Sequence, residues 1–163
     1  CIGKVFGGGL PLSACLSSQS VLSAWPENDG EAIHTNTFLG NPLSCATALA
    51  VLDIVEHLDV PERAEVLGSQ LLSELQDSLR GAERVSEVRG RGLMIGIELV
   101  TVDGSPWKGG ALRVAEAALA QGLIILPAGE YGHIVELTPS AFLTEDQATH
   151  SLVVLSSIIQ KIH

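Results

Sequence analysis

The chain has 163 residues, 46% of them hydrophobic, which is enough to build the core of one ordinary domain or of parts of two. Nine Lys and Arg residues against 19 Asp and Glu residues give a net charge of −10 with histidine neutral. Nucleic acids and anionic membrane surfaces bind clustered Lys and Arg, so this acidic balance argues against both as partners.

The first third of the chain predicts one long helix after a stretch with little regular structure. Residues 12–18 are small and apolar, as in a buried strand. Residues 43–58 are rich in Ala and Leu and predict a long, largely buried helix. Asn41 suits the N-cap of this helix and Pro42 its first turn. We expect a change of domain close to its end, around residues 58–61.

Helices and short strands alternate in the rest of the chain. An apolar stripe at i, i+4 spacing predicts a helix that begins at Pro61 and stops at Gly81. A further helix is expected over residues 108–121, and a last one from an N-cap at Thr144 to near residue 162. Four strands are expected, over residues 85–89, 93–100, 123–126 and 133–137, with Gly90 and Gly92 in the first bend. This order predicts a compact α+β domain whose antiparallel sheet is covered by helices.

The chain has three cysteines, Cys1, Cys15 and Cys45, and five scattered histidines. No pair has the spacing of a metal site, so no metal ligand is predicted, and the thiols suit a reducing, cytoplasmic compartment. No apolar run approaches the ~20 residues of a membrane-spanning helix, and no signal peptide is visible. The chain starts without Met and in the middle of a motif, so we expect it to be a fragment of a longer protein.

Lys4 is one of only three lysines, and a glycine triplet, Gly7 to Gly9, follows it. Glycine has no Cβ and lets the backbone come close to a ligand. A lysine in a partly dry site loses its proton more easily and can then attack a carbonyl group. From these residues alone, a surface lysine that precedes a glycine turn is the simpler interpretation.

Three stretches together resemble class III aminotransferases, which depend on pyridoxal phosphate (PLP). The stretches are Gly3-Lys4 with residues 7–14 (GGGLPLSA), residues 34–42 in the pattern H-x-x-T-x-x-x-N-P, and residues 89–98 in the pattern R-G-x-G-L-M-x-G-x-E. They occur in the family's order and cover essentially the whole chain, but only the C-terminal part of a family member. The resemblance implies an α/β fold of fold type I. Residues 1–58 would end the large PLP-binding domain, and residues 59–163 would form the small α+β C-terminal domain.

The resemblance also implies the reaction, in which an amino group moves from an amine or amino acid donor to a 2-oxo acid. Lys4 would be the catalytic residue, holding PLP as a Schiff base and moving a proton at the substrate α-carbon. Thr37 matches a threonine that reaches the cofactor phosphate of the neighbouring subunit, which implies a homodimer with a shared active site. A threonine at a loop end that bonds its own backbone is the simpler interpretation. Arg89 and Arg91 are expected to pair with local acids such as Glu87 or Glu98 rather than with a substrate carboxylate.

One segment departs from the family's pattern. Residues 135–140 align with x-R-x-x-P-P, whose arginine grips the substrate α-carboxylate, but Glu136 stands at that arginine's position and Ser140 replaces the second proline. A carboxylate repels a carboxylate substrate and attracts an ammonium group, so we expect Glu136 to favour an amine or diamine donor, or a substrate whose carboxylate lies elsewhere. The alternative, that Glu136 only faces solvent, remains open.

Several parts of the family's active site lie upstream of this chain by the same resemblance. They are the acid that binds the pyridine nitrogen, the aromatic ring that stacks on the cofactor and the main phosphate-binding loop. We therefore expect this chain alone to bind PLP poorly and to catalyse little. Two other functions remain open, namely a PLP-dependent aminomutase or racemase of the same superfamily and a non-catalytic, degenerate paralogue.

Overall fold

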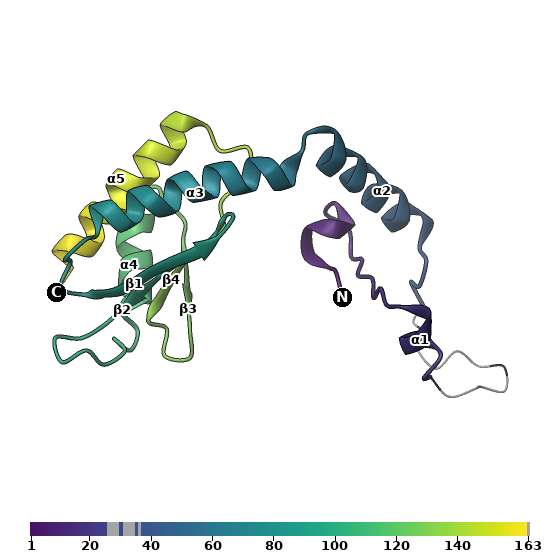
Figure 1. Cartoon of the computed structure of the whole chain (residues 1–163), viewed down its shortest axis with the longest axis horizontal. Helices are drawn as coiled ribbons and strands as arrows, with labels where there is room; N and C mark the ends of the chain where they lie inside the picture. The colour runs from purple at the N-terminus through teal and green to yellow at the C-terminus, as the bar shows by residue number, and fades with distance from the viewer. Residues whose placement is uncertain (26–29, 31–34, 36, 163) are drawn as a thin grey trace. The chain divides into compact units, whose positions relative to one another are not determined.

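The computed structural model describes residues 1–25, 30, 35 and 37–162, and these form two compact units, Cys1–Asp59 and Val60–His163. The boundary between the units falls within the range where the sequence suggests a change of domain. That the units correspond to the ends of a large and a small domain stays a prediction. We describe each unit by itself (Figure 1).

The first unit contains three short or medium helical elements and no extended sheet within its described residues. They are the 3-10 helix η1 (Lys4–Gly7), α1 (Gln19–Leu22) and α2 (Pro42–His57). Ile2 and Ala14 form an isolated antiparallel bridge. The strand predicted over residues 12–18 is therefore wrong apart from this bridge, and Leu16 is 70% exposed. A strand needs a partner along its length, and among the described residues of this unit only Ile2 pairs with the segment.

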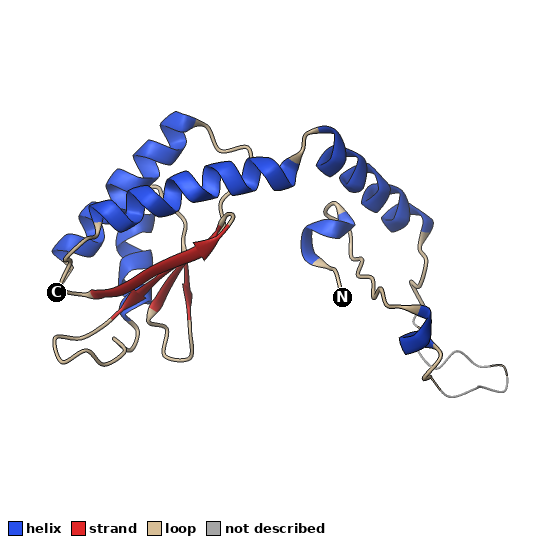
Figure 2. Ribbon diagram, viewed as in Figure 1, coloured by secondary structure: helices blue, strands red, loops and turns tan. Residues whose placement is uncertain are grey.

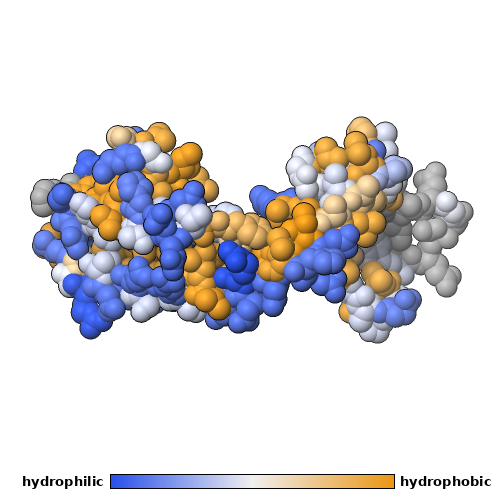
Figure 3. Space-filling view, turned by 90° about the horizontal axis from the view of Figure 1, so that it is seen from above, coloured by the Kyte–Doolittle hydropathy of each residue, from blue (hydrophilic) through white to orange (hydrophobic). Residues whose placement is uncertain are grey.

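The helix predicted over residues 43–58 is confirmed as α2, but its predicted burial is wrong. Only Ser44 and Ala48 are buried, while Leu49 is 62% exposed. Apolar residues reach the surface in the part of the chain that holds α2 (Figure 3). The helix is apolar around most of its circumference, and such a helix needs packing partners on several of its faces. Within this unit, η1 is the element that packs on it.

The second unit is a four-stranded antiparallel sheet with helices packed on one face, as predicted (Figures 1 and 2). The strand order is β1-β2-β4-β3. The elements in chain order are α3 (Val60–Ser78), β1 (Val85–Arg91), β2 (Met94–Leu99), α4 (Gly110–Leu119), β3 (Leu126–Ala128), β4 (Ile134–Leu137) and α5 (Glu145–Lys161).

Alternation along the strands builds the core of this unit. Ile95, Ile97 and Leu99 of β2 point inward and are almost fully buried, while Met94 is exposed. The inward residues pack against α3, α4 and α5. The largest fully buried side chains are Leu75, Ile95, Ile97, Leu99, Val114, Val135, Leu155 and Ile159. The opposite face of the sheet carries charged residues, including Glu87, Arg89 and Glu98.

Two local signals fix the edges of these elements. Thr144 accepts a hydrogen bond from the Gln147 N–H while the Gln147 side chain accepts one from the Thr144 N–H, so the predicted N-cap of α5 is confirmed as a capping box. Gly92, with φ of 52°, turns β1 into β2, whereas Gly90 lies inside β1. A Cβ at Gly68 would lie 2.0 Å from the Gly92 carbonyl oxygen, so α3 and the β1–β2 turn touch backbone to backbone.

Strand β3 begins later than predicted. It runs over Leu126–Ala128 rather than over residues 123–126. The apolar run at residues 123–125 is periodic enough for a strand, but it forms the wall of a cavity instead. Helix α4 is likewise shorter than the predicted 108–121, since Gly109 at φ of 70° precedes it.

Candidate active site

The Lys4 segment is held in an unusual backbone conformation. Lys4 begins η1 with φ of 58°, in the left-handed region that residues with a side chain rarely adopt. Its side chain is exposed. Such conformations cost of order 1–3 kcal/mol and occur where the surrounding structure enforces them, often at functional sites. The Gly8 N–H donates to the Val5 carbonyl oxygen at 2.9 Å and closes the turn behind Lys4.

Helix α2 clamps this segment. The Thr47 hydroxyl donates to the Gly7 carbonyl oxygen at 2.9 Å, and it also lies 2.9 Å from the Ser44 carbonyl oxygen. A Cβ at Gly8 would lie 3.1 Å from a Val51 methyl group and 3.3 Å from the Thr47 carbonyl oxygen. The glycines therefore let the loop lie directly on the helix, and the helix fixes the position from which the Lys4 amine extends.

Thr47 holds the Lys4 segment on α2, and the sequence analysis missed this contact. Its signal was present, because a threonine is a poor helix former and stands here in the middle of an Ala- and Leu-rich helix. Nothing in the local pattern says which distant carbonyl such a hydroxyl binds. Only the fold brings it to Gly7.

Thr37 lies in the turn that leads into α2 and is exposed. The Asn41 side chain accepts hydrogen bonds from the Leu43 and Ser44 N–H groups, so the N-cap predicted there is confirmed. His34 and Asn36, which belong to the same motif, lie outside the described residues. Lys4 and Thr37 share the first unit, and no hydrogen bond joins them within the part of the chain that the structure describes.

Glu136 lies in the second unit, on the outward side of β4. Its inward neighbour Val135 is fully buried, and Glu136 pairs in register with Gly96 on one side and Leu126 on the other. Gly96 carries no side chain, and a Cβ there would meet only an Ile134 methyl group at 3.4 Å. The surface beside the Glu136 carboxylate is thus open on the Gly96 side.

Glu136 also lines a cavity of about 400 Å³ within the second unit. The walls are mainly apolar, and the polar contributions come from Glu136, Thr138, Ser140 and Ser151. Ser140, the second departure from the family pattern, thus lines the same cavity as Glu136. Glu136 is half-buried. Its contact with a donor stays a prediction.

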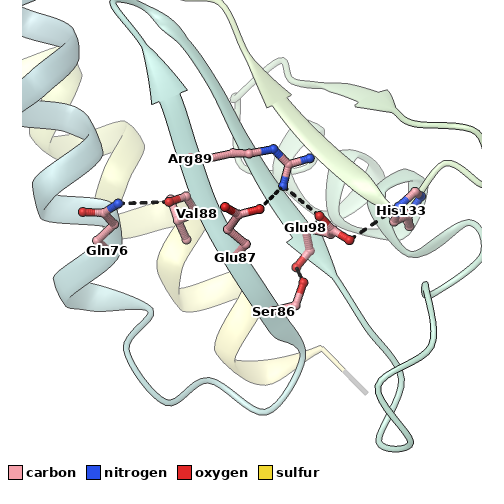
Figure 4. A network of polar contacts seen from close by, with 7 residues as sticks. All are labelled: Gln76, Ser86, Glu87, Val88, Arg89, Glu98 and His133. Carbon is pink, nitrogen blue, oxygen red and sulfur yellow. Dashed lines mark hydrogen bonds and ion pairs between the residues drawn. The ribbon is translucent and has the colours of Figure 1, made fainter.

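Arg89 is bound by two carboxylates on the outward face of the sheet (Figure 4). One guanidinium nitrogen lies 2.6 Å from Glu87 and 2.7 Å from Glu98. The hydrogen bond to Glu98 is the main cause that raises the pKa of Arg89 above its usual value. The local pairing predicted for Arg89 is therefore confirmed. No acidic partner of Arg91 occurs among the described residues.

His133 lies at the end of the same network. Its Nε2 is 4.0 Å from a Glu98 oxygen, the side chain is buried, and its ring is tilted against Tyr131. Its Nδ1 has no hydrogen-bond partner within the described residues. Gly129 gives this ring room, because a Cβ there would lie 2.8 Å from it. The network thus fixes the outward face of the sheet next to β4.

The described residues contain no cluster of three His, Cys, Asp or Glu side chains that could hold a metal ion. Over the same residues no helix is both long and apolar enough to cross a membrane.

Comparison with known proteins identifies the family. The sequence profile of class-III aminotransferases matches residues 1–159. The acetylornithine aminotransferase of Methanothermobacter thermautotrophicus is 33% identical over 158 residues, which cover 97% of this chain and 37% of that protein. The 4-aminobutyrate aminotransferase of Mycobacterium leprae is 34% identical over 162 residues, which cover 98% of this chain and 35% of that protein.

Solved structures agree with this result. A Bacillus anthracis aminotransferase superposes with a TM-score of 0.85 at 31% identity, over 97% of this chain and 37% of that one. An amine transaminase from an uncultivated Pseudomonas species, in its PLP-bound form, gives a TM-score of 0.72 at 37% identity, over 80% of this chain and 30% of that one. The chain belongs to the class-III aminotransferase family and has the α/β fold type I. It spans about a third of the length of the relatives it matches.

Proposed function

We propose that this chain is the C-terminal part of a PLP-dependent aminotransferase in which Lys4 is the catalytic residue. The observation that carries the proposal is the left-handed, α2-clamped backbone at Lys4, in a chain that the family profile matches almost end to end. Strain at an exposed lysine has no structural benefit in the described residues. The strain is explained if the backbone must hold the Lys4 amine in one direction.

Two of the described residues suit two groups of PLP, its aldehyde and its phosphate. The Lys4 amine is exposed and can bond an aldehyde, and the Thr37 hydroxyl lies in an exposed turn where it can donate to a phosphate. When bound, PLP supplies an electron sink for the bond broken at the substrate α-carbon. Lys4 would take the proton from that carbon and return it as the amino group moves to a 2-oxo acid. Thr37 would hold the phosphate end across a homodimer interface.

Glu136 would set the choice of donor in this reaction. The residue is half-buried, pairs with the side-chain-free Gly96 on the outward face, and is one of the residues that line a mainly apolar cavity. An ammonium group on an apolar body is the complement of such a surface. Arg89 is already neutralised by Glu87 and Glu98, so it does not offer a free cation to a substrate carboxylate. We therefore propose an amine or diamine as the donor.

The first unit would be the end of the large PLP-binding domain, and the second unit the small C-terminal domain. The exposed apolar residues of α2 support the first assignment, because the missing part of a large domain would cover them. A cytoplasmic location is part of the same proposal and is supported by three cysteines that are all free thiols.

The test is borohydride trapping of PLP in the family-length polypeptide that carries this chain. Reduction should fix the cofactor on Lys4, and Lys4→Arg should lose the label and the amino transfer. Lys108→Arg is the matched control, because it alters another of the three lysines and should keep both. Label spread evenly over the lysines, or retained in Lys4→Arg, would refute the proposal. Conversion of the donor without any 2-oxo acid would indicate the aminomutase or racemase instead.

A further inference from the structure

Gly96 lies in the middle of a row of residues that crosses the outward face of the sheet. It pairs in register with Arg89 of β1 on one side and with Glu136 of β4 on the other. Glu136 pairs in turn with Leu126 of β3. Directly opposed residues project to the same face of a sheet, about 5 Å apart. The row therefore carries, in order, a basic residue, a position without a side chain, an acidic residue and an apolar residue.

The packing of the described residues does not require glycine at position 96. The φ of Gly96 lies outside the left-handed region, and among the described residues a Cβ there would meet only an Ile134 methyl group, at an ordinary contact distance of 3.4 Å. Gly68 and Gly90 differ, because a Cβ at these positions would lie 2.0 and 2.8 Å from a backbone carbonyl oxygen. A glycine inside a strand weakens the strand, and it often marks a place where a ligand or another backbone approaches closely.

The charged neighbours of Gly96 leave the space above it open. The Arg89 guanidinium is drawn along the sheet to Glu87 and Glu98, at 2.6 and 2.7 Å (Figure 4). These two carboxylates belong to the next row, since Glu87 pairs in register with Glu98. A slot one side chain wide therefore remains between the positions of Arg89 and Glu136, and the backbone of β2 forms its floor.

We propose that Gly96 is a specificity-determining residue, and that the slot above it takes the unbranched alkyl chain of an amine donor. This role rests on the proposed function, in which Glu136 pairs with an ammonium group of the donor. The carbon chain next to that ammonium lies against the β2 backbone at Gly96, where no side chain excludes it. The Ile134 methyl group gives the chain an apolar contact on one side. Any side chain at position 96 would narrow the slot, so a donor with a branch beside the ammonium would be rejected first.

The experiment measures amino transfer to pyruvate by the family-length polypeptide that carries this chain. The donors are cadaverine, which is a linear diamine, and a cadaverine with a methyl branch beside one amino group. Gly96→Ala should lower kcat/KM about tenfold for the branched donor and less for the linear one, and Gly96→Val should lower it by about 10–200-fold for both. The loss should appear in KM with kcat nearly unchanged, because contact with the body of the donor is equal in the ground state and the transition state.

Ala128→Val is the matched control, because it adds methyl groups on the same face of the sheet, two strands away from Gly96 and in the next row. It should leave the kcat/KM of both donors unchanged. A double-mutant cycle of Gly96→Val with Glu136→Gln adds a second readout, since two residues that contact one donor should give non-additive losses. The PLP absorbance and thermal unfolding of each holoenzyme variant should match those of the original polypeptide.

The outcomes separate this role from the function on which it rests. No transfer from either amine by the original polypeptide would refute the proposed donor class and the role of Gly96 with it, while PLP trapping still reports on Lys4. Transfer with the same KM values in Gly96→Val would overturn the role of Gly96 alone. A lower PLP content or thermal stability in Gly96→Ala, with both donors affected equally, would show that another segment of the polypeptide packs on Gly96, and would also overturn it.

Discussion

The two units of this chain differ in how far each completes its own core. The second unit buries one face of a four-stranded sheet under three helices, and eight large side chains there have almost no exposure. The first unit buries only Gly7, Ser44 and Ala48 among its described residues, although α2 is the most apolar helix of the chain. Most of the apolar burial that stabilises the described residues therefore lies in the second unit. The strained lysine belongs to the first, whose apolar helix α2 is largely uncovered by the described residues.

A matched pair of leucines should give the largest difference. Leu75 in α3 is fully buried, and Leu75→Ala should cost about 2–5 kcal/mol because it removes packing and leaves a cavity. Leu49 in α2 is 62% exposed, and Leu49→Ala should change the free energy of unfolding by less than about 0.5 kcal/mol. Urea unfolding of the chain measures both. An equal loss of unfolding free energy in both variants would mean that Leu49 is buried by contacts that its 62% exposure does not show.

The backbone contact between α3 and the β1–β2 turn should come next. Gly68→Ala places a methyl group 2.0 Å from the Gly92 carbonyl oxygen and should destabilise the second unit by about 1–3 kcal/mol. Ser69→Ala is the control, because Ser69 is exposed on the same helix turn. Thermal unfolding compares the two, and a neutral Gly68→Ala would show that α3 can shift away from the hairpin.

A change in the second unit should redirect the reaction without touching the lysine of the first. Glu136→Arg should shift kcat/KM toward ordinary α-amino acids by about tenfold or more relative to amines, since an arginine–carboxylate fork replaces a like-charge repulsion. Glu136→Gln keeps the shape, removes the charge and should shift the ratio less. Donor assays and PLP trapping on the family-length polypeptide measure these effects. An unchanged ratio in Glu136→Arg would count against contact with the donor.

The hydrogen bond from α2 to the lysine loop should have a smaller and local effect. Thr47→Val removes the donor to the Gly7 carbonyl and should open the loop by roughly 1 kcal/mol, or about fivefold in the population open to protease. Trypsin cleavage after Lys4 reports this opening, and cleavage sites in the second unit serve as the internal reference. Thr47→Ser keeps the hydroxyl and should behave like the original chain. If it cleaves as fast as Thr47→Val, the methyl packing rather than the hydrogen bond holds the loop.

The smallest effect is expected from an exposed turn of the second unit. The Asp103 carboxylate accepts hydrogen bonds from the Thr101 hydroxyl and the Ser105 N–H, and the Thr101 bond is the main cause that holds the Asp103 pKa below its usual 3.8. A lowered folded-state pKa adds stability that is present above pH 3.8 and is lost as the pH falls through the folded-state pKa. Asp103→Asn should therefore be slightly less stable near neutral pH, with the difference vanishing in acid. Thermal unfolding at a series of pH values checks this sign.

Local signals in the sequence predicted what depends on neighbouring residues. The caps at Asn41 and Thr144 are confirmed because a short side chain and the next backbone N–H groups suffice to form them. Arg89 pairs with Glu87 and Glu98, which lie on the same hairpin. The family motifs pointed to Lys4 as well, but not to its left-handed backbone.

Contacts between distant segments could not be predicted in the same way. The hydrogen bond from Thr47 to Gly7 and the close approach of Gly68 to Gly92 arise only when separate elements pack. The prediction that α2 is buried was wrong for a related reason. An apolar composition indicates that a helix needs packing partners, but it does not show that those partners are present. The strand predicted over residues 12–18 failed because a strand needs a partner that the periodicity of one segment does not reveal.

The positive φ at Lys4 also bears on how this sequence can drift over evolutionary time. Glycine or asparagine would relax that backbone at once, whereas almost every other replacement would inherit the strain. A gene copy released from selection for chemistry would gain thermostability by exchanging the lysine for one of those two residues. A lysine at position 4 thus carries a backbone cost that either of those two residues would avoid.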